Sequence, residues 1–211
     1  MKTNKILTTL LLTGSISCTN TQNPIQISAT LVGGTCEVCE AVFEFGDKIL
    51  SPVDTLPNFH DEGPKLKVSG TIYLNDGTTP ARDVILYIYH TDQTGVYPTR
   101  GDETGWARRH GYIRGWVKTG LDGRYTFYTL KPGQYPTGNA AAHIHPVILE
   151  PDGKYYWINE YLFEGDEFLT KQDISQKSPR GSPGVLSLEK DDNLLVGVRD
   201  IVLGKNVPGY H

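Results

Sequence analysis

Two histidines one residue apart are the side chains of this chain whose spacing most directly suggests chemistry. They are His143 and His145, in the stretch "GQYPTGNAAAHIHPV" (133–147). In a strand, side chains two positions apart project from the same face, so the two imidazoles point together while Ile144 points the other way. Such a pair can bind one metal ion. The alternative is a pair of structural histidines that are held by hydrogen bonds.

Two tyrosines are candidates for the remaining ligands. Most of the twelve tyrosines lie at alternating positions of expected strands, where a place in the core explains them. Tyr97 and Tyr135 instead lie in loop sequences, "HTDQTGVYPT" and "LKPGQYPTG", and each is followed directly by proline. Proline disfavours helical geometry at the preceding residue, so both tyrosines are expected in extended backbone. Loop residues that a rigid scaffold positions often carry function.

The elements that must position these residues are strands. From about Lys65 to Phe163, β-branched and aromatic runs such as "LKVSGTIYL" and "RDVILYIYH" recur at about ten-residue spacing with Gly, Pro and Asp between them. This pattern predicts an all-β sandwich. We expect a signal peptide over 1–17, a tether and irregular N-terminal arm over 18–65, and the sandwich domain over 66–211.

The order of these motifs resembles the intradiol ring-cleavage dioxygenases. The resemblance covers roughly Gly70 to Phe163 and is carried by "YHTDQTGVY" (89–97), "IRGWVKTGLDGRYTFYTLKPGQYP" (113–136) and "HIH" (143–145). It implies the prealbumin-like β-sandwich of that family and a non-haem Fe(III) enzyme that opens catechol-type rings with O2, giving a muconate-type dicarboxylate. By motif, the resemblance makes the iron ligands Tyr97, Tyr135, His143 and His145.

The resemblance also implies roles beyond ligation. Tyr135 corresponds to the ligand that substrate displaces, and its phenolate would take a proton from the catechol. Arg114 matches the family's Arg-Gly pair and is a candidate catalytic residue. Trp106 and Tyr112 are candidates for lining a ring-binding pocket, although either could belong to the core.

One departure from the family pattern concerns charge. Family members usually carry an arginine three residues before the first histidine, and Ala140 stands there. Loss of such a preorganised cation can lower a rate by about 10²–10³. Arg100, Arg108, Arg109 or Arg114 could substitute. The alternative function is a metal-binding or carbohydrate-binding sandwich module without turnover.

The first residues indicate export. "MKTNKILTTLLLTGSISC" has Lys2 and Lys5, a short apolar run and small residues before Cys18, as in a secretory signal. The cysteine at the cleavage point resembles a bacterial lipobox, so we expect lipidation of Cys18 and attachment to a membrane surface. Removing 1–17 changes the formal charge from −4 to −6, because both lysines and no acid are lost. A mildly acidic exported protein has no electrostatic footprint for nucleic acid.

The sequence "CEVC" predicts a local disulfide between Cys36 and Cys39, because paired cysteines persist outside the cytoplasm. A haem-attachment site would need a following histidine, and Glu40 stands there instead. A zinc site would need two further ligands nearby. No oligomeric state is predicted.

Overall fold

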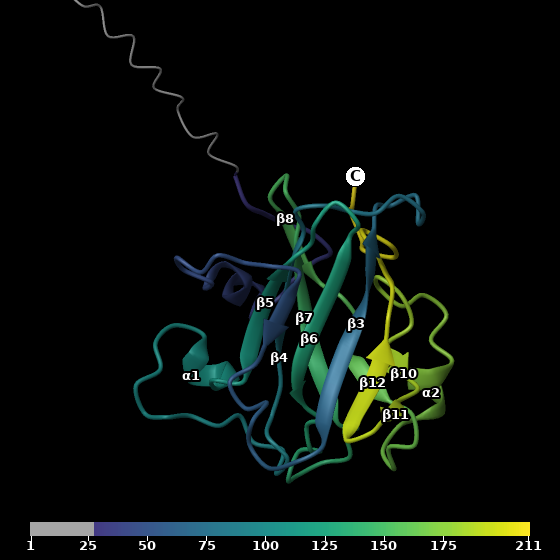
Figure 1. The fold of residues 1–211 in the computed structure, drawn as a ribbon. Coiled ribbons are helices and arrows are strands. Elements are labelled where there is room, and N and C mark those ends of the chain that lie inside the picture. The colour runs from purple at the N-terminus through teal and green to yellow at the C-terminus, as the bar shows by residue number, and fades with distance from the viewer. Residues whose placement is uncertain (1–27) are drawn as a thin grey trace, which may run out of the picture.

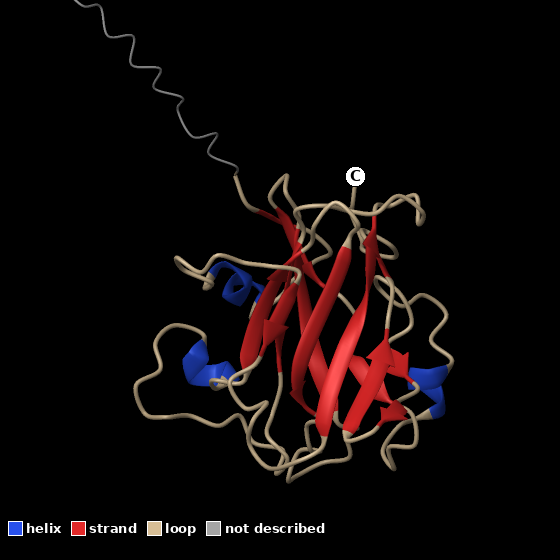
Figure 2. Cartoon of the chain, in the orientation of Figure 1, coloured by secondary structure: helices blue, strands red, loops and turns tan. Residues whose placement is uncertain are grey.

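Most of the regular structure in the protein is β-strand. The computed structural model describes residues 28–211, which contain strands and three short helices (Figure 2). These are η1 (Cys39–Phe43), α1 (Ala107–His110) and α2 (Lys171–Ile174). None of the helices in this range is long and apolar enough to cross a membrane. The expected signal peptide and Cys18 lie outside the described residues.

The strands form two sheets (Figure 1). The seven-stranded sheet has the order β1–β8–β7–β4–β5, with β9 paired to β7 and β10 paired to β9. Its strands are β1 (Thr30–Leu31), β4 (Ile85–Tyr89), β5 (Arg114–Lys118), β7 (His143–Leu149), β8 (Lys154–Trp157), β9 (Tyr161–Phe163) and β10 (Val185–Leu186).

The six-stranded sheet has the order β11–β12–β3–β6–β2, and β13 also pairs with β3. Its strands are β2 (Val53–Thr55), β3 (Lys65–Tyr73), β6 (Arg124–Leu130), β11 (Glu189–Asp191), β12 (Leu194–Val198) and β13 (Ile201–Val202).

The main core lies between the two sheets. Leu66 and Phe127 of β3 and β6 are fully buried and belong to one cluster with Leu86 and Ile148 of β4 and β7. Alternation along each strand turns these residues inward and their neighbours to the opposite face. Two sheets that share one apolar core are a β-sandwich, which confirms the predicted fold class.

The outer face of the seven-stranded sheet is also covered. Tyr87, Trp116 and Val147 form a second buried cluster with Ala41 and Val42 of η1. The indole N–H of Trp116 donates to the carbonyl of Val42 at 3.0 Å. The N-terminal segment therefore packs against the sheet that carries His143 and His145.

This N-terminal segment is tied down in two ways. Cys36 and Cys39 form a disulfide immediately before η1, with their Cα atoms 5.6 Å apart. Strands β1 and β2 pair with β8 and β6, so the segment adds one short strand to each sheet.

Candidate metal centre

Four side chains from three places in the chain meet at one end of β7. Tyr97 lies in the loop between β4 and α1, Tyr135 lies in the loop between β6 and β7, and both histidines lie on β7. The Tyr97 Oη atom is 2.8 Å from Tyr135 Oη and 3.0 Å from His145 Nε2. The His143 Nε2 atom is 3.2 Å from Tyr135 Oη and 3.1 Å from His145 Nε2. These four atoms, called the donor cluster below, therefore form a closed ring.

The size of this ring suits one metal ion. Nitrogen and oxygen ligands bind a first-row metal ion at about 2.0–2.2 Å. Neighbouring ligands that subtend a right angle are then about 3 Å apart. The four separations of 2.8–3.2 Å match this value. A pair of histidines that merely bond to each other would not need two phenols from distant loops at the same spacing.

The proton on His143 is placed so that its other nitrogen is free to ligate. His143 Nδ1 lies 2.7 Å from the carbonyl oxygen of Ala141, and a carbonyl only accepts, so Nδ1–H is the donor. In the neutral ring the lone pair is then on Nε2, which is the atom in the donor cluster. Metal-binding histidines commonly donate their second ring nitrogen in this manner.

Burial shapes the ionisation of the other donors. Burial, and then the neighbouring ring of His143, lower the pKa of His145 to about 3, so its imidazole is neutral at physiological pH. Burial, followed by the hydrogen bond with Tyr135, raises the pKa of Tyr97 well above its ordinary value. A bound cation would reverse this effect on Tyr97, because a nearby positive charge favours phenolate. The donor set therefore fits a hard, highly charged ion.

The two tyrosine loops are held together by close backbone contact. Gly95 has φ +78°, and a Cβ there would lie 1.7 Å from the carbonyl oxygen of Gln134 and 2.9 Å from the Cα of Tyr135. The backbone N–H of Gly133 also donates to the carbonyl of Asp92 at 2.8 Å. Only glycine permits both the dihedral angle and the approach at position 95, so the loops meet where the tyrosines need to meet.

Asp166 holds both ends of the Tyr135 loop. One carboxylate oxygen accepts from the side-chain amide of Gln134 at 2.7 Å, and the other accepts from the backbone N–H of Ala142 at 3.1 Å. The residues that precede Tyr135 and His143 are thus tied to one carboxylate, which fixes the separation of the two ligands. Sequence reasoning missed Asp166, which lies beyond the family-like stretch.

An aromatic stack supports His145. The ring of Tyr89 lies parallel to that of His145, with centroids 4.6 Å apart, and His110 stacks on the other side of Tyr89 at 3.7 Å. The Oη atom of Tyr87 lies 2.7 Å from His110 Nδ1. Tyr89 pairs with both Arg114 and His145 across the sheet, so these three residues form one row on its outer face.

Arg114 is paired with a residue that the sequence did not single out. Its Nη1 atom lies 2.6 Å from Glu44 Oε2, and the other oxygen of Glu44 accepts from the backbone N–H of Trp106 at 2.9 Å. Trp106 stacks on His110, while Tyr112 lies under the guanidinium of Arg100 at 4.1 Å. The structure therefore brings Arg114 and Trp106 beside the aromatic stack, and neither they nor Tyr112 touches the donor cluster.

Two cavities border the donor cluster. One, of about 290 Å³, is lined by His145 and Tyr89, by the disulfide segment 35–38 and by Trp157 and Glu160. The other, of about 210 Å³, is lined by His143, Ala140, Leu162, Phe168 and again Glu160. Each is large enough for part of a small aromatic ligand and has walls that mix apolar and polar side chains.

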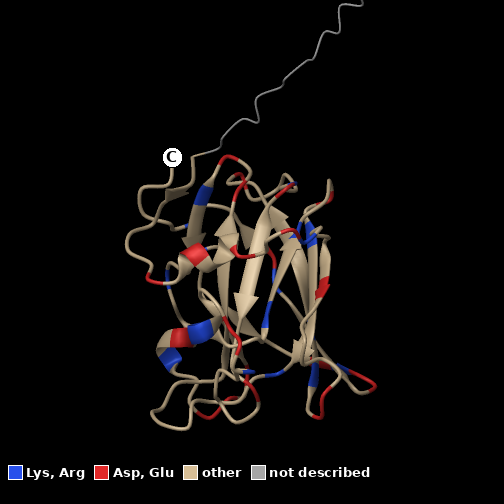
Figure 3. Cartoon of the chain, turned by 90° about the vertical axis from the view of Figure 1, so that its left-hand side faces the viewer, with Lys and Arg blue, Asp and Glu red and all other residues tan. Residues whose placement is uncertain are grey.

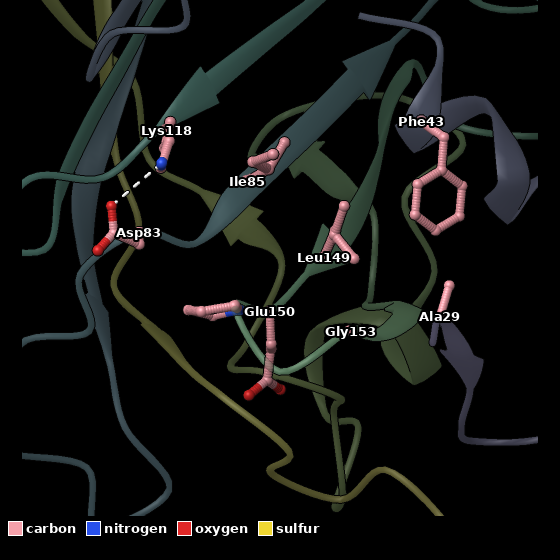
Figure 4. A pocket seen from close by; sticks show the side chains of 9 residues that line it. Ala29, Phe43, Asp83, Ile85, Lys118, Leu149, Glu150 and Gly153 are labelled. Atoms are coloured by element: carbon pink, nitrogen blue, oxygen red, sulfur yellow. Dashed lines mark ion pairs between the residues drawn. The ribbon is translucent and has the colours of Figure 1, made fainter. Parts of the chain in front are cut away.

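A third, larger cavity of about 460 Å³ lies elsewhere on the sheet (Figure 4). It is lined by Phe43, Ile85 and Leu149 together with an ion pair between Lys118 and Asp83. Ile85 and Leu149 are at the opposite ends of β4 and β7 from Tyr89 and His145. This cavity includes no residue of the donor cluster.

The described residues contain no group of three or more His, Cys, Asp or Glu side chains placed to hold a metal ion. The donor cluster consists of two histidines and two tyrosines, so the phenols are essential to it.

A family model described as "Dioxygenase" matches residues 48–198, which is more than half of the chain. The chain belongs to the intradiol ring-cleavage dioxygenase family.

Curated relatives carry the same family identity. The chain is 26% identical over 155 residues to the protocatechuate 3,4-dioxygenase beta chain of Burkholderia cepacia, covering 65% of this chain and 63% of that relative. It is 31% identical over 136 residues to catechol 1,2-dioxygenase 1 of Acinetobacter lwoffii, covering 57% of this chain and 42% of that relative. The matched part thus spans 63% and 42% of these relatives' length, less than two-thirds in both cases.

Solved structures of the family share the fold. The dioxygenase domain of a dioxygenase–carbohydrate-binding fusion protein from Streptomyces sp. SirexAA-E superposes with a TM-score of 0.54 at 26% identity, covering 74% of this chain and 90% of that chain. An intradiol ring-cleavage dioxygenase from Tetranychus urticae gives 0.52 at 19% identity, covering 82% and 94%. At 19% identity, the similarity to the Tetranychus urticae structure shows the fold alone.

Proposed function

We propose that this family member is an Fe(III) enzyme that cleaves catechol-type aromatics between their two hydroxyl groups with O2, giving muconate-type dicarboxylates. The observation that carries the proposal is the donor cluster, in which two phenol oxygens and two imidazole nitrogens lie 2.8–3.2 Å apart in a ring. Hard anionic oxygen donors favour Fe(III), and imidazole accepts iron as readily as other transition metals.

In this proposal Tyr97, Tyr135, His143 and His145 hold the iron. When bound there, Fe(III) would supply Lewis-acid chemistry for the diol. The neutral imidazoles contribute no charge, so the two phenolates offset much of the charge of the ion. His143 keeps its orientation through the hydrogen bond to Ala141, and His145 through its stack on Tyr89.

The two tyrosines have different surroundings, which suggests different roles. Tyr97 is half-buried and packs against the second buried cluster, and its ring lies 5.9 Å from that of Tyr89. Tyr135 is followed by five exposed residues, Pro136 to Ala140. A side chain at the start of an exposed loop is freer to leave the cluster. We therefore assign Tyr135 the part of the leaving donor, which takes a proton from the incoming diol.

A second candidate function is metal binding without turnover. It is favoured by Ala140, which lines the cavity beside His143 where a cation would otherwise face the substrate, and by the pairing of Arg114 with Glu44. These two observations leave the cavity beside His143 without a basic side chain among the residues that line it.

Export and lipid attachment through Cys18 are also part of the proposal, and their support is the sequence of residues 1–18. In this setting the protein would meet its substrate outside the cytoplasm, on a membrane surface.

One experiment separates the two functions. The purified protein is loaded with Fe(III), its visible spectrum is recorded before and after addition of catechol, and oxygen uptake is followed with an electrode. The enzyme is expected to be coloured by tyrosinate-to-iron charge transfer, to change colour with catechol and to consume oxygen. Colour without oxygen uptake over a panel of catechols would favour metal binding alone. Colourless protein that retains no iron would refute both.

A further inference from the structure

The charge around the two cavities beside the donor cluster points to a class of substrate. Glu160 lines both cavities, and its carboxylate oxygen lies 3.9 Å from His145 Nδ1. Glu37 lines the first cavity and Asp173 the second. Every ionisable side chain that lines either cavity, apart from the two histidines and Tyr89, is therefore acidic.

The arginines of this region do not line either cavity. Arg114 pairs with Glu44 at 2.6 Å and is not a wall of either cavity. Arg180 stacks at 3.6 Å on the ring of Trp157, which lines the first cavity, and donates to the carbonyl of Gly33. Figure 3 shows the side of the molecule that carries η1 and α1, where acidic and basic residues are interspersed.

The acidic walls are not neutralised by ion pairs. Among residues 28–211, no lysine or arginine nitrogen lies within 4.0 Å of the carboxylates of Glu37, Glu160 or Asp173. Glu160 is 41% exposed, so its charge reaches the cavities through partly screened surroundings. A ligand that binds at the donor cluster thus meets a carboxylate and no lysine or arginine among the residues that line either cavity.

We propose that the site selects catechols whose ring substituent is cationic or neutral and discriminates against catechols that carry a carboxylate, with Glu160 as the main specificity-determining residue. This inference rests on the proposed function for the position of the catechol ring. A substituent charge about 6–8 Å from a carboxylate, at an effective dielectric constant of about 40, changes an equilibrium constant by about tenfold. Attraction of a cation and repulsion of an anion act in opposite directions, so the charge of the substituent orders the affinities.

The test is a binding titration with three catechols of matched size. Each carries one substituent para to a hydroxyl: ethyl (neutral), aminoethyl (cationic) or carboxymethyl (anionic). The Fe(III)-loaded protein is titrated without oxygen, and the catecholate absorption band reports Kd directly. The expected order of affinity is cationic, then neutral, then anionic, with at least about a tenfold gap between the extremes. The gap should shrink at ~1 M salt, where the Debye length falls to about 3 Å.

Two variants test the assignment to Glu160. Glu160→Gln keeps the size of the side chain and should reduce the cation-to-anion ratio of Kd to about threefold or less, with little change for the neutral catechol. Glu189→Gln is the matched control, since Glu189 is an exposed residue of β11 in the six-stranded sheet and lines neither cavity. It makes the same change in net charge and should leave the ratio unaltered. If Glu160→Gln does not take up iron, Glu37→Gln at the exposed wall of the first cavity provides the same comparison.

The outcomes distinguish this inference from the proposed function. Equal or tighter binding of the anionic catechol overturns the inference, even if oxygen is consumed and the proposed function stands. If the three catechols bind in the expected order of affinity but no oxygen is consumed, the inference is supported and the proposed ring-cleavage activity is overturned. If Glu160→Gln and Glu189→Gln change the cation-to-anion ratio of Kd equally, Glu160 is not the specificity-determining residue. Failure of all three catechols to bind overturns both proposals.

Discussion

Replacing Gly95 with alanine should disassemble the donor cluster without touching a ligand. The Cβ of alanine would lie 1.7 Å from the carbonyl oxygen of Gln134, where ordinary contact begins near 3.4 Å. The loops of Tyr97 and Tyr135 must then separate by about 1.7 Å, the difference between these distances. The Oη atoms are now 2.8 Å apart, so a movement of this size prevents both from binding one ion.

The free energy of the change has two parts. Alanine in the left-handed region at φ +78° costs about 1 kcal/mol relative to glycine. Forcing a methyl group into closely packed backbone typically costs a further ~1–3 kcal/mol. We therefore expect Gly95→Ala to lower the free energy of unfolding by about 2–4 kcal/mol and to weaken Fe(III) binding strongly.

Gly138 provides a matched control in the loop between Tyr135 and His143. Its φ is +96°, and a Cβ there would have no atom within 4 Å. Gly138→Ala should carry only the conformational cost and keep the iron. The assays are urea unfolding of the metal-free proteins and Fe(III) titration followed by the visible tyrosinate band. Wild-type iron affinity and an unchanged band in Gly95→Ala would refute the argument that this contact sets the spacing of the tyrosines.

Four further changes have expected outcomes. Tyr97→Phe removes a proposed ligand and should weaken Fe(III) binding by at least about 100-fold, since loss of an outer-shell partner alone can cost about 10–100-fold. An Fe(III) titration in which this variant retains the visible band would show that Tyr97 is not a ligand. Ala140→Arg places a cation beside the cavity of His143 and should tighten binding of the carboxymethyl catechol by about tenfold, measured with the same anaerobic titration; unchanged binding would contradict the charge argument. Burial lowers the pKa of His90 to about 4 and that of His110 to about 3. Between pH ~6.5 and ~4 only the unfolded state takes up these protons, so the free energy of unfolding should fall by about 1.4 kcal/mol per pH unit for each histidine. Urea unfolding at pH 7 and pH 5 tests this, and equal stabilities at the two pH values would refute it. Cys18→Ser should abolish incorporation of labelled fatty acid and release the protein from membranes, and retention of both would exclude lipidation at this residue.

The sequence could predict the sandwich and the four residues that meet in the donor cluster because both leave signals along the chain. Alternation over β3 and β6 marks the strands, and the spacing of His143 and His145 places both rings on one face of β7. The order of motifs along the chain predicts that Tyr97 and Tyr135 join these two histidines. What the structure adds is that loops 38 residues apart bring their phenol oxygens within 2.8 Å.

The parts that sequence reasoning missed depend on contacts between distant segments. Glu44 reaches Arg114 across 70 positions, and nothing in the residues around either one indicates the partner. The single carboxylate of Asp166 links the side-chain amide of Gln134 to the backbone N–H of Ala142, at the two ends of a loop that precedes it. The sequence around Tyr89 indicates only a strand position, whereas its register opposite His145 places its ring against that imidazole. Pairing across a sheet could not be read from one strand alone.

The disulfide segment lies at a boundary between two environments. One side of residues 35–38 faces the cavity beside His145, and η1, which follows Cys39 immediately, is packed on the outer face of the seven-stranded sheet. A shortened chain that began at β3 would keep all four donor residues and yet expose Tyr87, Trp116 and Val147 to water. It would also lack one wall of the cavity and the partner of Arg114. All four donor residues and Glu160 lie from β3 onward, whereas residues 35–38 before it supply one wall of the cavity beside His145.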